Sequence, residues 1–101
     1  MTARLNATSG KEIDMFGIGE GPFHSAEKKM HQDMMSAEGS SVDETWVRKM
    51  IAHHEGGIEM SEIVLQQGTD PEVQRKARET IEEQRKDIEE LNRILTQRQA
   101  A

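Results

Sequence analysis

The chain has 101 residues, a net charge of −6 and no cysteine, and 32% of its residues are charged while only 3% are aromatic. This length fits one domain, and this composition favours solvated helices over strands. The acidic balance argues against nucleic acid as a partner, the lack of thiols excludes disulfides, and no stretch has the roughly 20 apolar residues of a membrane span.

Residues 1–22 are predicted to form an irregular N-terminal arm, because several glycines and Pro22 interrupt any regular pattern. A small apolar group in this arm is suited to packing on the domain or on a second copy of the chain. It consists of Ile13, Met15, Phe16 and Ile18. Residues 23–98 are predicted to form the helical domain.

The first helix is predicted at about 24–38, with Gly39 ending it. At 3.6 residues per turn, its positions form two lines along the helix. The apolar line consists of Phe23, Ala26, Met30, Met34 and Ala37, and the second line consists of His24, His31 and Met35.

The second helix is predicted at about 42–67. Ser41 and Glu44 have the spacing of a capping box, and Gly68 stops the helix. At 100° per residue, one set of positions falls within about a quarter turn; we call it the 42–64 stripe, and it consists of Val42, Trp46, Met50, His53, Gly57, Met60 and Val64. Val47, Ile51, His54, Ile58 and Leu65 widen this apolar side, whereas the opposite side reads Glu44, Arg48, Glu55, Glu59, Glu62 and Gln66.

The third helix is predicted to start at residues 69–72 and to run to about 97. Asp70 is suited to cap it and Pro71 to its first position. Its inward stripe is Val73, Ala77, Ile81, Gln84, Ile88, Leu91 and Leu95. The connections near 39–41 and 68–70 are short, so neighbouring helices run antiparallel. The predicted fold is therefore all-α, an antiparallel, up-down-up bundle of three helices.

Methionine and histidine are concentrated in one part of the chain, since all four histidines and six of the seven methionines lie between positions 15 and 60. Thioethers and imidazoles in a chain without thiols indicate a soft or borderline metal ion, and copper fits first. On the second helix, Met50, His53 and Met60 share one strip, and His54 lies four residues after Met50. We predict these four as copper ligands and favour Cu(I) over Cu(II).

A further donor group lies on the first helix. Met30 and Met34 belong to its apolar line, whereas His31 and Met35 lie outside that line, where packing does not require them. We predict all four as additional ligands, because two packed helices can bring His31 or Met35 toward His53.

The same residues also have a purely structural interpretation. Methionine commonly fills gaps in cores, and each histidine can cap a carbonyl or pair with a carboxylate such as Asp33 or Asp87. Adjacent helical residues diverge by 100°, so His53 and His54 flank one spot or serve two sites. Gln84 interrupts the inward stripe of the third helix, where it bonds to a histidine or sets the register.

Other chemistries fit poorly. The chain lacks the paired Glu-x-x-His motifs of a di-iron bundle, and the segment from His54 to Ile58 lacks the second histidine of a zinc protease. No Gly-x-Ser-x-Gly elbow occurs, and the glycines at 17–21 lack the Lys-Ser/Thr of a phosphate loop. We therefore predict a protein that is not an enzyme.

The segment Trp46–Met60, with its central His53-His54, resembles the signature of the domain of unknown function 305 family. Asp70-Pro71-Glu72 and the spacing from Gln84 to Asp87-Ile88 are also similar to that family, over about residues 23–97. The resemblance implies a ferritin-like helical bundle and a secreted or periplasmic protein that binds copper and is linked to copper tolerance. It implies the same candidate ligands on both helices.

Three positions depart from the pattern of that family. Ala52 stands where the family usually has proline, Gly57 where alanine is common, and Leu91 where methionine is common. The last difference removes one possible soft ligand from the third helix.

The sequence thus predicts a copper-binding protein that sequesters or carries the ion outside the cytoplasm without catalysis. The alternative is a structural bundle without metal, a homodimer or higher homo-oligomer whose core is the Met-rich face. An enzyme such as a cuprous oxidase is the least favoured interpretation, because no general acid, base or substrate pocket is readable in the sequence.

Overall fold

The computed structural model describes residues 20–100, and these residues form three α-helices without any strand. They are α1 (His24–Ser36), α2 (Val42–Gln67) and α3 (Pro71–Ala100). The predicted all-α fold of three packed helices is confirmed. The predicted apolar group of the arm, Ile13 to Ile18, lies outside the described residues.

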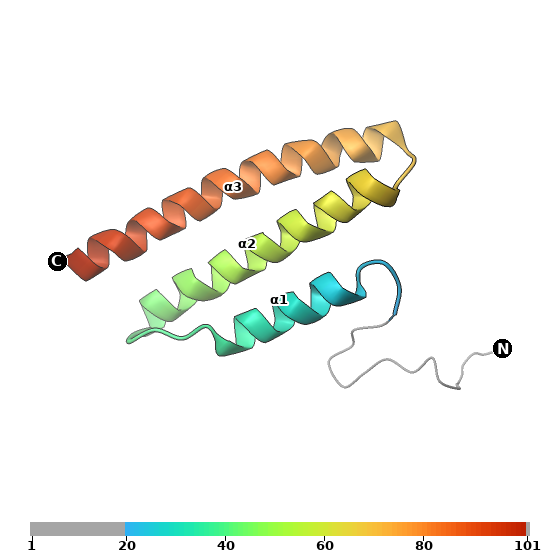
Figure 1. The fold of residues 1–101 in the computed structure, drawn as a ribbon. Coiled ribbons are helices and arrows are strands. Elements are labelled where there is room, and N and C mark those ends of the chain that lie inside the picture. Colours follow the sequence, from blue (N-terminus) through green and yellow to red (C-terminus); the bar gives the residue numbers. More distant parts are fainter. Residues whose placement is uncertain (1–19, 101) are drawn as a thin grey trace.

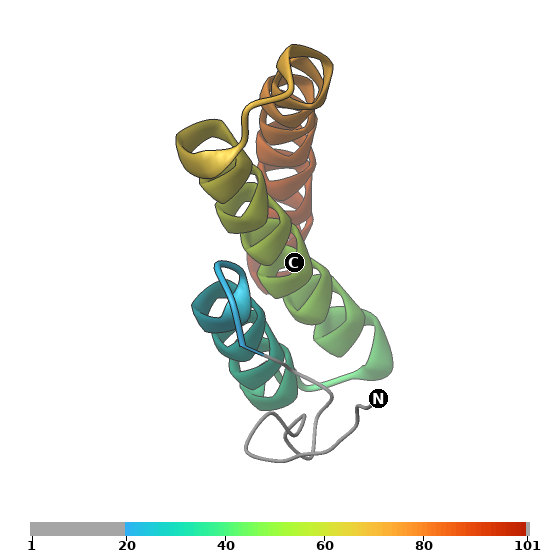
Figure 2. The ribbon, with the colours of Figure 1, turned by 90° about the vertical axis from the view of Figure 1, so that its right-hand side faces the viewer.

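The three helices are arranged with α2 in the middle. Both α1 and α3 pack against α2 and make few contacts with each other (Figures 1 and 2). Contacts at both ends show that neighbours run antiparallel: Met34 of α1 meets Lys49 of α2, while Lys29 meets Glu59. The molecule is therefore a layer of helices in which α2 has a neighbour on each side.

The end of α1 differs from the prediction. The helix stops at Ser36, and Ala37 is already extended, so Gly39 does not play the expected C-terminal role. The amino group of Lys49 donates a hydrogen bond to the Met34 carbonyl. The same carbonyl accepts the backbone N–H of Ala37 at 3.3 Å, so the lysine adds a second donor from α2 and holds the two helices together.

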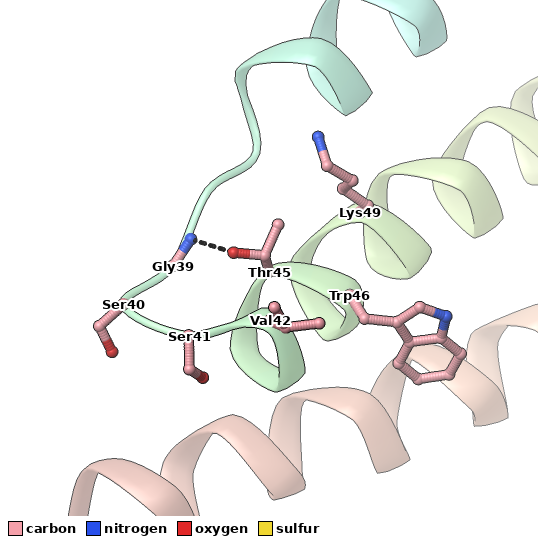
Figure 3. Close-up of a pocket in the computed structure, with 7 residues that line it drawn as sticks. All are labelled: Gly39, Ser40, Ser41, Val42, Thr45, Trp46 and Lys49. Carbon is pink, nitrogen blue, oxygen red and sulfur yellow. Dashed lines mark hydrogen bonds between the residues drawn. The ribbon is translucent and has the colours of Figure 1, made fainter.

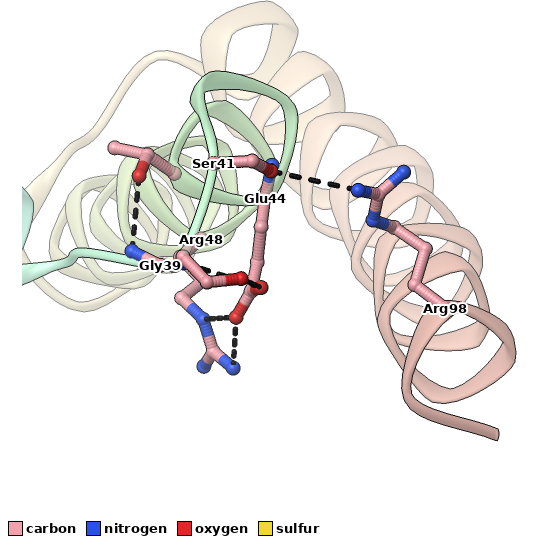
Figure 4. A network of polar contacts seen from close by, with 7 residues as sticks. Gly39, Ser41, Glu44, Arg48 and Arg98 are labelled. Atoms are coloured by element: carbon pink, nitrogen blue, oxygen red, sulfur yellow. Dashed lines mark hydrogen bonds and ion pairs between the residues drawn. The ribbon is translucent and has the colours of Figure 1, made fainter. Parts of the chain in front are cut away.

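The start of α2 is held by a polar network around Glu44 (Figure 4). The Ser41 hydroxyl accepts the backbone N–H of Glu44 at 3.1 Å, as the capping box predicts. The Glu44 carboxylate, however, accepts from the backbone and hydroxyl of Ser40 and from Arg48. These bonds hold the pKa of Glu44 below its ordinary value of 4.5, and the bond from the Ser40 hydroxyl has the largest effect. Arg98 of α3 reaches Ser41 at 3.5 Å.

The start of α3 follows the sequence prediction. Asp70 accepts the backbone N–H groups of Glu72 and Val73 at 2.8 and 3.1 Å, and Pro71 is the first helical residue. Gly68 follows directly after the last residue of α2. The tight connection therefore rests on local capping chemistry that is readable from the sequence.

The core is thin. Its central cluster joins Val47 of α2 to Leu91 and Leu95 of α3, with Met50 and Ile51 packed against it. The other buried apolar residues are Ala26, Ala52, Ala77 and Ile81. No side chain among residues 20–98 is less than 2% exposed. Most of the predicted stripe of α3 is thus confirmed as inward, although Val73 at its start is exposed.

Two adjacent glycines position the helices around α2. A Cβ atom at Gly56 would lie 2.4 Å from the Met30 sulfur of α1, and one at Gly57 would lie 2.3 Å from the Gln84 side-chain oxygen of α3. Both α1 and α3 therefore pack a side chain directly against the backbone of α2. These two contacts place Met30 of α1 and Gln84 of α3 beside consecutive residues of α2.

Candidate metal centre

The best-defined donor group centres on His54, whose side chain is 16% exposed between α2 and α3. Its Nδ1 atom lies 2.7 Å from the carbonyl oxygen of Met50, one turn earlier on the same helix. Its Nε2 atom lies 3.4 Å from Oδ2 of Asp87 on α3. Both alternatives considered for a histidine here, a carbonyl cap and a carboxylate partner, thus occur together at His54.

These contacts decide which nitrogen is available to a ligand. A carbonyl oxygen can only accept, so Nδ1 carries the hydrogen of a neutral imidazole and Nε2 carries the lone pair. That lone pair faces the carboxylate of Asp87, which is itself an acceptor. Two acceptors at this distance are stabilised by a cation between or beside them, either a proton on Nε2 or a metal ion.

A pocket of about 280 Å³ opens at this point between α2 and α3. Its polar and sulfur-containing lining residues are Met50, His54, Asp87 and Glu90. Trp46 and Leu91 complete the lining with apolar surface. Residues that carry sulfur, nitrogen and oxygen donors therefore line one small space, which we call the His54 pocket.

The remaining candidate ligands of α2 lie elsewhere. His53 is exposed, and its ring centroid is 5.9 Å from that of His54, with the ring planes at 69°. Met60 lines a second pocket, together with Phe23, Val64 and Val73. The structure thus brings Met50 and His54 together and sets His53 and Met60 apart from the His54 pocket.

The candidates on α1 are also spread out. Met30 packs on Gly56 of α2, and Met35 is 64% exposed at the end of the helix. His31 and Met34 are partly buried. Within residues 20–100, no three His, Asp or Glu side chains come together as a metal-binding group. A soft-metal site in this part of the chain therefore depends on thioether sulfur.

The three residues of α3 that line the His54 pocket were absent from the predicted ligand set. Glu90 and Leu91 lie three and four residues after Asp87, on one face of the helix. This spacing is readable in the sequence. Their position opposite His54 depends on the register between α2 and α3, which no local pattern contains.

An ion pair outside the pocket joins α1 to α2. The hydrogen bond and charge of Asp33, followed by the charge of Glu59, raise the pKa of Lys29. Lys29 lies 2.9 Å from Asp33 and 3.7 Å from Glu59. Asp33 thus pairs with a lysine on its own helix.

The signature segment of the chain now has a place in the fold. It forms the middle of α2, the central helix, and contains His54 together with the two glycines against which α1 and α3 pack. It also forms one wall of the His54 pocket. The family model described as Domain of unknown function (DUF305) matches residues 2–95. The chain belongs to the DUF305 family. The predicted family resemblance is thereby confirmed.

A search of curated proteins found no match. Over the described part of the chain, none of the helices combines the length and apolar character needed to cross a membrane.

Proposed function

We propose that this protein binds copper, with Cu(I) favoured, and sequesters or carries the ion outside the cytoplasm without catalysing a reaction. The observation that carries the proposal is the His54 pocket. There Met50, His54 and Asp87 line one small space between two helices, and Nε2 of His54 lies 3.4 Å from the Asp87 carboxylate. The location outside the cytoplasm rests on the family resemblance alone.

The donors of the pocket suit copper for chemical reasons. Cu(I) accepts soft thioether and imidazole ligands, and copper binds nitrogen and sulfur ligands more tightly than the other common divalent metals do. In this proposal, Met50 supplies the sulfur and His54 the nitrogen, while Asp87 lies beside the ion and balances its charge. The Met50 carbonyl, by accepting from Nδ1, keeps the ring oriented as a metal ligand requires.

The other predicted ligands stay predictions under this proposal. They are Met30, His31, Met34, Met35, His53 and Met60. Each offers a donor of the right type, so the protein has room for more than one bound ion. The His54 pocket is the place where the described residues support a specific pair of ligands.

The experiment that tests the proposal is an anaerobic competition for Cu(I) between the protein and a coloured chelator. The wild type should withdraw copper from the chelator. His54→Gln and Met50→Leu should each weaken binding about tenfold or more, since each removes a ligand. Glu55→Gln is the control, because it changes an exposed side chain of the same helix that does not line the pocket.

Fluorescence gives a second measurement in the same samples. Trp46 is the only tryptophan of the chain and lines the His54 pocket, so copper bound there should quench its emission. Failure of the wild type to compete for Cu(I) would overturn the proposal. Equal competition by His54→Gln and the wild type would exclude this pocket as the site.

A further inference from the structure

The two neighbours of α2 lie on opposite sides of it. Gly56 receives Met30 from α1, whereas His54 reaches Asp87 on α3. These two positions of α2 are two residues apart, which places them about 160° apart around the helix axis. Because α1 and α3 make few contacts with each other, two long faces of α2 remain between them (Figures 1 and 2).

The two open faces of α2 differ in character. One is the charged side predicted from the sequence, which includes Arg48, Glu55 and Glu62. The other is the 42–64 stripe, where Gln84 of α3 covers Gly57 and Met50, Met60 and Val64 are half-buried. At its N-terminal end, Val42 is 85% exposed and Trp46 is 57% exposed, and His53 at its centre is exposed as well. The exposed end of the stripe is therefore apolar where an open helix face is normally polar.

The surroundings of Trp46 extend this apolar surface. A pocket of about 470 Å³ lies at the start of α2, bordered by Val42, Thr45, Trp46 and Lys49 (Figure 3). Trp46 lines both this pocket and the His54 pocket. The indole thus borders two pockets, one of them lined in part by α3, and remains 57% exposed.

We infer that a second copy of this chain packs on the 42–64 stripe. Helical domains bury their apolar faces between two packed layers, and this chain supplies one layer with no fully buried side chain among residues 20–98. From Trp46 to Val64 the spacing of the stripe alternates between four and three residues, which is the spacing of a seam between two helices. A second copy carries the same seam, so a two-fold contact is self-complementary.

Charge also favours this face over the others. The chain has a net charge of −6, so two copies repel each other over most of their surface. The 42–64 stripe contains no carboxylate, whereas the opposite face of α2 carries several. Two acidic copies therefore approach through the stripe at the lowest electrostatic cost.

The geometry of the stripe assigns a central residue to the contact. His53 lies midway between Val42 and Val64. In any two-fold contact centred on the stripe, the His53 residues of the two copies are neighbours. This inference does not depend on the proposed copper site, so its tests use metal-free protein.

The first test is sedimentation equilibrium over a wide range of protein concentration. The wild type should be a dimer, and Trp46→Glu should be a monomer, because a charge in the seam opposes its burial. Gln66→Glu is the matched control, since it adds the same charge to the opposite face of α2. Circular dichroism checks that Trp46→Glu keeps its helices, as expected for a side chain that is 57% exposed.

The second test uses the absence of cysteine in the wild type. Under mild oxidation, His53→Cys should give a disulfide-linked dimer, whereas Glu55→Cys, on the charged face, should stay uncrosslinked. A wild type that remains monomeric at all concentrations would overturn the inference and leave the stripe to a different partner. A dimer that crosslinks through position 55 and not through position 53 would overturn it as well.

Discussion

The Nε2 atom of His54 faces the Oδ2 atom of Asp87 across 3.4 Å, while the other ring nitrogen already bonds to the Met50 carbonyl. The neutral ring thus presents a lone pair to a carboxylate. This arrangement favours a cation in the His54 pocket. A side chain that replaces the Asp87 carboxylate by a hydrogen-bond donor should therefore change both copper binding and stability.

Asp87→Asn should have opposite effects on copper binding and on the stability of the metal-free protein. The Asn amide donates to Nε2 and occupies its lone pair, so copper affinity should fall about tenfold to a hundredfold. In slightly alkaline buffer, the free energy of unfolding of the metal-free protein should stay the same or rise by up to about 1 kcal/mol. Chelator competition and urea denaturation measure the two quantities.

The control for this substitution is Glu89→Gln, which removes a carboxylate from an exposed position of α3. It should leave copper affinity close to that of the wild type. An Asp87→Asn variant that binds copper as tightly as the wild type would show that Nε2 is not a ligand.

Leu91→Met should raise the affinity for Cu(I). Leu91 lines the His54 pocket with Met50, and it stands where the family resemblance places a methionine. A third soft donor in the pocket should improve affinity about tenfold, which corresponds to about 1.4 kcal/mol. Leucine and methionine have similar volumes, so the free energy of unfolding should change by less than about 1.5 kcal/mol.

Leu95→Met is the matched control for this gain of affinity. Leu95 belongs to the same buried cluster one turn further along α3, but it does not line the pocket. It should leave the affinity for Cu(I) unchanged in the competition assay. An equal gain from both substitutions would mean that the added sulfur acts outside the His54 pocket.

Alanine at the two adjacent glycines should have effects of opposite sign. At Gly56 the new Cβ would meet the sulfur, Cγ and Cβ of Met30, so α1 itself must move, and the free energy of unfolding should fall by about 1–3 kcal/mol. At Gly57 it would meet only the carboxamide end of Gln84, which can swing away. The higher helix propensity of alanine should then stabilise the protein by up to about 1 kcal/mol.

Urea denaturation of the two single variants tests this contrast, and each variant serves as the control for the other. A stabilised Gly56→Ala variant would mean that Met30 is not seated on the helix backbone. A strongly destabilised Gly57→Ala variant would mean that the Gln84 carboxamide is held in place.

The network at the start of α2 should make stability depend on pH through Glu44. Hydrogen bonds from Ser40 and then Arg48 hold the pKa of Glu44 below 4.5 in the folded protein. A lowered folded pKa means that the stabilisation is present above pH 4.5 and is lost as the pH falls through the folded value. The wild type should therefore be more stable than Glu44→Gln at neutral pH, and this difference should shrink below pH 4.5.

An NMR titration of the Glu44 carboxylate checks the cause of this dependence. In Ser40→Ala, which lacks the donating hydroxyl, the pKa of Glu44 should move up toward its ordinary value. An unchanged pKa in that variant would assign the lowering to Arg48 instead.

Much of the fold is predictable because its causes are local. The 3.6-residue period places α2 and the inward face of α3, and Ser41 and Asp70 cap their helices as their side chains suggest. The end of α1 is less predictable. The Met34 carbonyl in its last turn accepts from Lys49, fifteen residues later in the chain, and the nearby Gly39 lies beyond the end of the helix.

The candidate site is only partly predictable for the same reason. Met50 and His54 lie one turn apart on a single helix, so their proximity is a property of the sequence. Asp87 and Leu91 join them through the packing of α3 on α2. The helical period groups His53 with Met50, yet the two neighbouring helices leave His53 exposed.

The sequence by itself determined where the helices lie, which sides of them are apolar and which donor atoms the chain can offer, because backbone hydrogen bonding and side-chain spacing act over a few residues. The tertiary structure alone decided that His54, and not His53, faces a carboxylate across a pocket. That choice follows from the way α3 packs on α2 through Val47, Leu91 and Leu95. The alignment of two packed helices depends on contacts between segments far apart in the chain, and no local pattern specifies those contacts.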